Sequence, residues 1–138
     1  MEFDPIEALN DAQTEDLHRF YQSEWWTRGR TLAETRRMLQ HSDVVVGFCT
    51  PPSQRLVAFA RVLTDYLYKA LILDVIVDPA YRGRQLGRAL IDRIVSHPSL
   101  ESVSHFELYC LPGLVRFYEK WGFTNDLGPL RFMRLTRR

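Results

Sequence analysis

The sequence predicts a single α/β domain in which a mixed, mostly antiparallel sheet is flanked by helices. Apolar residues in the first forty positions recur at helical spacing, whereas residues 43–77 hold three short runs rich in β-branched residues, separated by turns. Residues 87–95 then show helical periodicity and are followed by a return strand, which indicates a crossover connection. Since no repeat, low-complexity tract or linker interrupts the chain, we treat residues 1–138 as one domain.

Two helices are predicted before the first strand. Thr14 can cap a helix that places Leu17, Phe20 and Tyr21 on one face and ends near Trp25. Thr31, with a glutamate three residues later, has the spacing of a capping box and predicts the start of a second helix.

The strands are predicted at residues 43–50, 55–63, 70–77 and 103–110. Prolines directly after residue 50 end the first of them, because proline cannot donate to a central ladder. Pro112 is suited to the first turn of a further helix. We predict a last strand at residues 130–136.

Composition narrows the class of protein. The chain has 138 residues, 46% hydrophobic and 25% charged, which is ordinary for a water-soluble domain. A net charge of +1 gives no electrostatic support for nucleic-acid binding. The apolar run at residues 70–77 is far shorter than the roughly 20 residues that cross a bilayer, so we expect no membrane partner.

The start of the chain and the cysteines suggest a reducing compartment. Glu2, Asp4 and Glu7 stand where a secretory signal would carry basic and then apolar residues, so we expect a cytoplasmic location. Cys49 and Cys110 have no metal-type spacing to histidine or to each other, which favours reduced thiols and no metal site.

The loop after the third strand has the properties of an anion site. Residues 81–88 lead directly into a helix, whose first amides and partial positive charge suit a pyrophosphate. Arg82, Arg84 and Arg88 add positive charge. A basic helix start that merely tolerates glycine is the alternative. The ending of a nucleotide P-loop and the dinucleotide spacing are both absent, which disfavours ATP and NAD.

Residues 75–90, read as VIVDPAYRGRQLGRAL, resemble the signature of the GNAT superfamily of acyl-CoA N-acyltransferases. The family pattern falls on Arg82, Gln85 and Gly87, with Gln85 in place of the usual first glycine. Residues 117–123, FYEKWGF, are similar to a second family segment that ends a helix. Leu111 replaces an asparagine that is common in the family.

The resemblance implies a site for acetyl-CoA and a proton donor for the departing thiolate. Tyr118 matches the family's proton donor, and the alternative is a tyrosine that packs its helix against the sheet. Backbone groups of the central strand would bind the pantetheine arm, and the following loop would bind the diphosphate. The implied cofactor-binding residues are Val75, Ile76, Val77, Arg82, Gly83, Arg84, Gln85, Leu86, Gly87 and Arg88.

Asp74 interrupts an apolar strand, where a carboxylate requires compensation. The resemblance to polyamine and amino-sugar acetyltransferases suggests that Asp74 holds the incoming ammonium and accepts its proton. The alternative is a structural carboxylate capped by backbone amides or paired with an arginine. Trp25, Trp26 and Arg30 lie where the family builds its acceptor pocket, although the tryptophans are equally suited to anchoring the core.

We therefore expect an N-acetyltransferase that moves an acetyl group from acetyl-CoA to a small primary amine by direct transfer in a ternary complex. A polyamine-like or arylalkyl amine ranks ahead of the alternative acceptors, a protein lysine or N-terminus. A non-catalytic CoA-binding regulatory module is the rival from another class. A covalent route through Cys110 and His105 is disfavoured, because residues five apart point to opposite faces of a strand. Pairing into a homodimer is a general expectation only.

Overall fold

The computed structural model describes residues 2–138. Contacts divide the chain into two compact units, residues 1–108 and 109–138, which are described one at a time. The first unit contains β1 (Asp4–Ile6), α1 (Asp11–Ser23), α2 (Leu32–Gln40), β2 (Val44–Thr50), β3 (Arg55–Thr64), β4 (Lys69–Val77), α3 (Leu86–Val95) and β5 (His105–Glu107). Within residues 2–138 we find no helix with the length and apolar character that a bilayer span requires.

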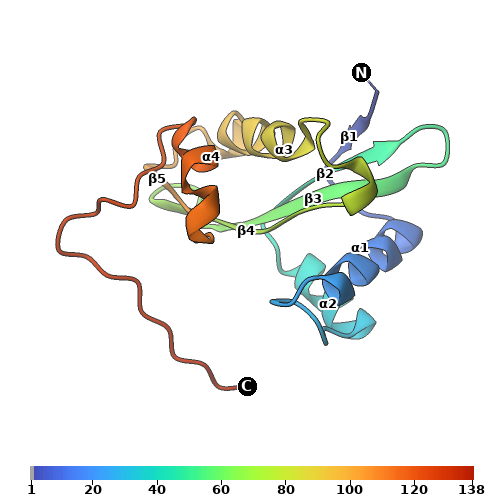
Figure 1. Ribbon diagram of the computed structural model, residues 1–138, viewed down its shortest axis with the longest axis horizontal. Coiled ribbons are helices and arrows are strands. Elements are labelled where there is room, and N and C mark those ends of the chain that lie inside the picture. Colours follow the sequence, from blue (N-terminus) through green and yellow to red (C-terminus); the bar gives the residue numbers. More distant parts are fainter. Residues whose placement is uncertain (1) are drawn as a thin grey trace. The chain divides into compact units, whose positions relative to one another are not determined.

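The sheet of the first unit has the order β1-β2-β3-β4-β5. Neighbours from β1 to β4 are antiparallel, and β5 runs parallel to β4. Helices α1 and α2 lie on one face of the sheet and α3 on the other (Figure 1). The predicted fold class, a mixed and mostly antiparallel sheet flanked by helices, is confirmed.

A β-bulge interrupts the pairing of β3 with β4. Phe59 lies opposite Ile76 and Arg61 opposite Leu73, so that one residue of β3 faces both Asp74 and Val75. Asp74 has a φ of 55°, a left-handed conformation that non-glycine residues seldom adopt. The bulge therefore redirects the side chain of Asp74 at the middle of the strand.

The core of the first unit forms where α1 packs on the sheet. Leu17, Phe20 and Tyr21, the three residues predicted to share a helix face, are all buried against Phe59 and Ile76. On the other face, α3 buries its own apolar side chains, Leu86, Leu90, Ile91 and Ile94. Both helices thus hold the sheet through apolar burial, the main stabilising term in a domain of this size.

The helix boundaries follow the capping chemistry. The predicted capping box is confirmed, since Thr31 Oγ1 accepts from the Glu34 amide at 3.0 Å and Glu34 Oε1 accepts from the Thr31 amide at 2.9 Å. The first helix begins earlier than predicted, because Asn10 is the cap and forms its own box with Gln13. Thr14 lies inside the helix, where its hydroxyl donates to the Asn10 carbonyl at 2.9 Å.

Two strand predictions need correction in the first unit. β1 was not predicted; it is a three-residue strand that pairs Asp4 with Cys49 of β2. The strand predicted at residues 103–110 is limited to β5, which pairs with Lys69–Leu71 of β4. As a result, β4 continues beyond the end of this pairing, and residues 72–77 have no partner in β5.

The second unit contains a 3-10 turn, Pro112–Leu114, followed by α4 (Val115–Glu119). Pro112 stands at the start of this turn, as predicted. The last strand predicted at residues 130–136 is wrong, because no strand forms there. The apolar side chains of this segment are exposed, Met133 by 88% of its surface. An alternation of apolar and polar residues does not form a strand unless a neighbouring strand is there to pair with it.

Candidate active site

The loop between β4 and α3 combines a capped turn with two left-handed residues. Asp78 ends the strand and accepts from the Ala80 amide at 3.0 Å, which fixes the 3-10 turn Pro79–Tyr81. Gly83 has a φ of 80° and Gln85 a φ of 65°. Gln85 stands where the family pattern has its first glycine, and it adopts the left-handed region that glycine occupies without strain and that costs a residue with a side chain about 1–2 kcal/mol.

The first amides of α3 have no acceptor in the described part of the chain. Asn10 and Thr31 cap the starts of α1 and α2 with their side chains, whereas Gln85 at the start of α3 makes no such bond. The first bond of α3 runs from the Ala89 amide to the Gln85 carbonyl at 3.0 Å. Four consecutive amides, those of residues 85–88, are therefore free to bind an anion at the positive end of the helix dipole.

Arginine side chains surround this helix start. Arg84 pairs with Glu2 at 2.8 Å and lies over the ring of Tyr81, 5.4 Å from its centroid. Arg82 lies 3.4 Å from Glu24. Arg88 is exposed in the first turn of the helix. All these side chains are at the surface, so the carboxylate partners of Arg82 and Arg84 contribute little energy and can be displaced by a phosphate.

The end of β4 presents peptide groups at an open edge. The Asp78 amide donates to the Val57 carbonyl of β3 at 2.8 Å, and the register places Ile76 opposite Phe59 in the next bonded pair. Because peptide groups alternate in direction, the Val77 amide and carbonyl and the Val75 carbonyl point away from β3. The peptide groups of Ile76 point toward β3, so its backbone is engaged in the sheet.

Asp74 is the centre of a buried cluster. Its Oδ2 accepts from Arg30 Nη1 at 2.8 Å, from Arg61 Nε at 2.8 Å and from Tyr21 Oη at 2.9 Å. The carboxylate is 4% exposed, and the Arg61 side chain is 12% exposed. Asp74 is thus paired with two arginines, one of the two forms of compensation that the structural alternative expected.

The charges of this cluster set the protonation of its members. Burial alone would raise the pKa of Asp74, but the hydrogen bond from Arg30 and the charge of Arg61 outweigh burial and hold that pKa below its usual value. Burial, with the charge of Asp74 beside it, raises the pKa of Tyr21 well above the ordinary phenol value. At neutral pH the cluster holds one carboxylate, two guanidiniums and a neutral phenol.

The segment between α1 and α2 brings Arg30, one of the predicted acceptor-pocket residues, into this cluster, and it also carries Trp25 and Trp26. Trp25 is 71% exposed and Trp26 is 40% exposed, so the alternative that they anchor the core is wrong. Arg30 stacks over Tyr21, 4.6 Å from the ring centroid. A buried hydrogen bond from Thr27 to the Tyr21 carbonyl, at 2.9 Å, and a partly buried one from Gln22 to the Arg30 carbonyl, at 2.7 Å, hold the segment in place.

Arg61 and Tyr21 belong to the cluster and were not predicted as site residues. Arg61 carried a usable signal, because it interrupts the apolar run 55–63 as Asp74 interrupts its own strand. Two opposite charges in adjacent buried strands are expected to pair. Tyr21 gave no such signal, since its spacing with Leu17 indicated only a core position.

In the second unit, Tyr118 is buried among aromatic rings on and after α4. The ring centroids of Phe117 and Phe123 lie 5.0 Å and 6.0 Å from that of Tyr118. Burial, with a smaller contribution from Cys110, raises the pKa of Tyr118 to about 12. The phenol is therefore protonated throughout the neutral range, as a proton donor must be.

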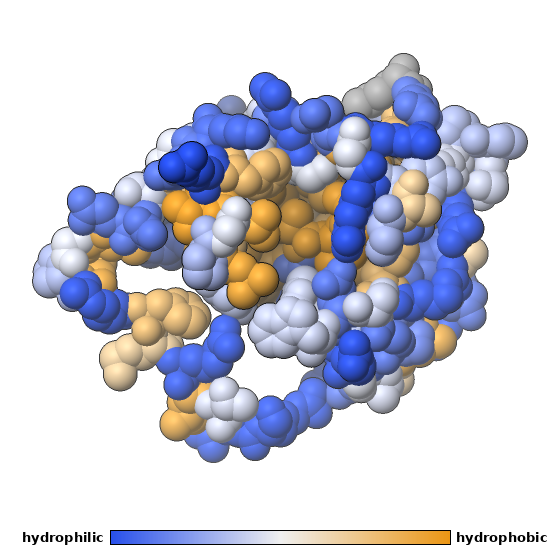
Figure 2. Space-filling view, viewed as in Figure 1, coloured by the Kyte–Doolittle hydropathy of each residue, from blue (hydrophilic) through white to orange (hydrophobic). Residues whose placement is uncertain are grey.

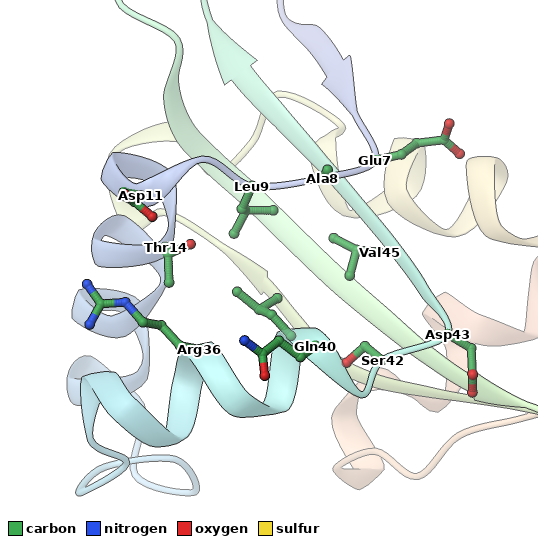
Figure 3. A pocket seen from close by; sticks show the side chains of 11 residues that line it. Glu7, Ala8, Leu9, Asp11, Thr14, Arg36, Gln40, Ser42, Asp43 and Val45 are labelled. Carbon is green, nitrogen blue, oxygen red and sulfur yellow. The ribbon is translucent and has the colours of Figure 1, made fainter.

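A cavity of about 400 Å³ lies elsewhere in the first unit. Figure 3 shows that its wall comes from the segment after β1, including Glu7 and Leu9, from Arg36 and Gln40 of α2, and from Val45 of β2. None of the residues predicted to carry chemistry lines this cavity. In the view of Figure 2, hydrophilic residues cover the outer side of α3.

Known proteins are similar to this chain in sequence and fold. The sequence pattern described as acetyltransferase (GNAT) domain matches residues 39–125. A serotonin N-acetyltransferase 2 of Oryza sativa, named as chloroplastic, is 38% identical over 74% of this chain and 52% of its own length. A histone acetyltransferase of Glycine max is 29% identical over 84% of this chain and 54% of its own length. This chain thus spans about half the length of these plant relatives.

Solved structures agree with the sequence match. A putative GNAT acetyltransferase from Xanthomonas campestris superposes with a TM-score of 0.82 at 30% identity, and the alignment covers 97% of this chain and 94% of that one. A putative acetyltransferase from Deinococcus radiodurans gives a TM-score of 0.79 at 25% identity, covering 96% of this chain and 88% of that one. The sequence pattern alone covers more than half of this chain, and it matches the region that contains the loop, the bulged strand and α4. The chain belongs to the GNAT acetyltransferase family.

Proposed function

We propose that this chain is an acyl-CoA-dependent N-acetyltransferase. The observation that carries the proposal is the set of uncapped amides at residues 85–88, which follows directly on the open edge of β4. The amides and arginines offer a site for the diphosphate of acetyl-CoA, and the peptide groups of Val75 and Val77 offer hydrogen bonds to an extended pantetheine arm. Ile76 makes no direct contact in this assignment, because its peptide groups face β3 and its side chain is buried against α1.

Transfer requires a neutral amine, a polarised thioester carbonyl and a proton for the leaving group. The amine nitrogen forms a bond to the carbonyl carbon, the carbon–sulfur bond breaks, the amine loses one proton and the thiolate gains one. By its match to the family segment, we assign Tyr118 as the donor of the proton to sulfur. Its raised pKa supports this assignment, because the phenol keeps its proton until it is needed.

The acceptor in this proposal is a small primary amine, and the cluster around Asp74 favours an arylalkyl amine over a polyamine. Two guanidiniums already neutralise the carboxylate, and the excess positive charge repels a polycation. Exposed Trp25 and Trp26 supply aromatic surface close by in the sequence. The relative named as a serotonin N-acetyltransferase supports the same ranking, and the one named as a histone acetyltransferase keeps protein lysine as the second candidate.

Asp74 acts in this proposal by positioning rather than by accepting a proton. Its three donors all reach Oδ2, and its lowered pKa makes it a weak base. Oδ1 takes no part in these three bonds and is the atom that would accept from the amine. We also propose that residues 1–138 work as one catalytic domain. The cytoplasmic location and the homodimer stay predictions.

The test is release of CoA from acetyl-CoA in the presence of a panel of amines, followed by mass measurement of each product. We expect CoA release that depends on the amine, and a product heavier by one acetyl group. A CoA-binding regulatory module would be stabilised against heat by acetyl-CoA and would yield no product. That result would contradict the enzymatic assignment while leaving the cofactor site in place.

A further inference from the structure

We propose that Arg30 and Arg61 bind an oxyanion on the acceptor, so that the preferred amine also carries a carboxylate or a phosphate. This inference rests on the proposed function and narrows its substrate class. It starts from the charges of the Asp74 cluster, where two guanidiniums meet one carboxylate. One positive charge is left without a partner in the cluster, at a place where the side chains are largely withdrawn from water.

The guanidinium groups have donors to spare. Arg61 uses Nε toward Asp74, and Arg30 uses Nη1. The two Nη atoms of Arg61 make no hydrogen bond within residues 2–138, yet no side-chain nitrogen that is fully buried in that range lacks a partner. The Nη atoms must therefore reach solvent, although the side chain as a whole is 12% exposed. A buried stem with open donor tips is suited to binding two oxygens of one anion.

The ion pair with Asp74 fixes the direction of these donors. Arg61 is held at Nε, and Arg30 is held by both the hydrogen bond to Asp74 and the ring of Tyr21. Donors that are already in place lose little entropy when they bind, which makes them selective for one geometry. Asp74 thus holds the two guanidinium groups in position, and they neutralise its negative charge.

The position of the cluster fits a role in acceptor recognition. Asp74 stands directly before Val75 in the bulged part of β4, one residue from the edge proposed for the thioester. Tyr21 and Arg30 come from α1 and the segment after it, on the opposite face of the sheet from α3 (Figure 1). An acceptor that enters from the α1 face therefore meets the two arginines before it reaches the edge of β4.

The exposed tryptophans offer a surface for an aromatic group on the acceptor, in addition to the arginines that bind its oxyanion. Trp25 and Trp26 lie in the same segment as Arg30, and they offer flat apolar surface. An amine with an aromatic body and a carboxylate uses both features. An aromatic amino acid is the simplest compound that combines them, and we take tryptophan as the probe.

The experiment compares tryptophan with tryptophanamide, which has the same aromatic body and lacks the negative charge of the carboxylate. The amide has the less basic amine and therefore more neutral amine at a given pH, so that any preference for the acid comes from the carboxylate. We expect kcat/KM for tryptophan to exceed that for tryptophanamide by about tenfold, the value of one charge-assisted hydrogen bond. A ratio at or below one would overturn the proposal. Phosphoethanolamine against ethanolamine, measured in the same way, shows whether a site upheld by the tryptophan pair also accepts a phosphate.

Arg30→Gln tests whether Arg30 causes the preference for the carboxylate, and Arg28→Gln is the matched control in the same segment. Arg30 is 33% exposed, so its replacement perturbs folding less than replacement of Arg61. We expect Arg30→Gln to bring the acid-to-amide ratio close to one and Arg28→Gln to keep the wild-type ratio. Arg30→Lys should recover part of the preference, because the charge returns without the planar fork. An unchanged ratio in Arg30→Gln would refute the role of this residue.

A binding measurement separates this inference from the proposed function. Calorimetry with N-acetyltryptophan and N-acetyltryptophanamide requires no turnover, and we expect the acid to bind about tenfold more tightly. Tighter binding of the acid by a chain that releases no CoA would uphold the oxyanion site and reject the enzymatic function. Equal affinity of the two compounds would overturn the oxyanion site, whatever the activity.

Discussion

Arg61 Nε lies 2.8 Å from Asp74 Oδ2, and this ion pair bridges β3 and β4 at the bulge between them. The bulge gives Asp74 its left-handed conformation and turns the carboxylate toward the arginine and Tyr21. A strained backbone position and a buried charge therefore stabilise each other. Neither would be favourable alone, since each costs free energy without the other.

Asp74→Asn should destabilise the chain strongly. Removing the charge leaves Arg61 buried without its partner, and breaking a buried pair in this way costs about 3–5 kcal/mol. Urea unfolding at pH 7 measures the loss, with Glu15→Gln on the exposed side of α1 as a control expected to change stability by less than ~0.5 kcal/mol. A loss in Asp74→Asn no larger than in the control would show that the ion pair carries no stability.

The same ion pair predicts how stability depends on pH. Because the folded pKa of Asp74 is lowered, the stability that this group contributes is present above the unfolded value of about 3.9 and is lost as pH falls toward the folded pKa. Unfolding measured from pH 6 down to pH 2 should show a steeper acid loss in the wild type than in Asp74→Asn. Parallel curves would contradict the lowered pKa.

Tyr118→Phe should lower kcat by about a hundredfold or more and leave the affinity for acetyl-CoA nearly unchanged, because general acid catalysis contributes at least this factor. The phenol keeps its proton up to a pKa of about 12, so the wild type should show no loss of kcat between pH 7 and pH 10. Steady-state rates across that range test both statements. If Tyr118→Phe turns over at the wild-type rate at every pH, Tyr118 is not the proton donor.

Gln85 should tolerate glycine and reject a β-branched residue. At a φ of 65°, glycine removes the side-chain strain, whereas valine adds about 1–2 kcal/mol. We expect Gln85→Gly to bind acetyl-CoA as the wild type does, and Gln85→Val to bind it more weakly and to unfold at a lower temperature. Equal thermal stability of the two variants would show that the left-handed conformation does not constrain this position.

The fold was predictable where local signals agree with burial. The capping box of Thr31 and Glu34 predicted the start of α2, and the spacing of Leu17 with Tyr21 predicted the buried face of α1. The first strand was missed because three residues around Pro5 carry no strand pattern, and their pairing with β2 is decided by contacts more than forty residues away. The opposite error occurred at residues 130–136, where an apolar alternation has no strand beside it.

The anion-binding loop of the candidate site was predictable from the sequence, whereas the hydrogen-bond partners of Asp74 were not. Glycine, arginine and glutamine in the loop after β4 indicated an anion site, and the uncapped start of α3 has the geometry that such a site needs. The partners of Asp74 could not be derived from spacing. They come from α1, the following segment and β3, and only the bulge in β4 brings the carboxylate to them.

The most direct test of the cofactor site compares acetyl-CoA with S-acetylpantetheine, which has the same thioester arm and lacks the diphosphate together with the phosphorylated adenosine attached to it. Calorimetric titration of the wild-type chain should show acetyl-CoA binding at least about a hundredfold more tightly, since several charge-assisted hydrogen bonds to the amides and arginines of residues 82–88 are lost with the diphosphate. Equal affinity of the two compounds, or no heat with saturating acetyl-CoA, would contradict the claim that the uncapped start of α3 binds the diphosphate.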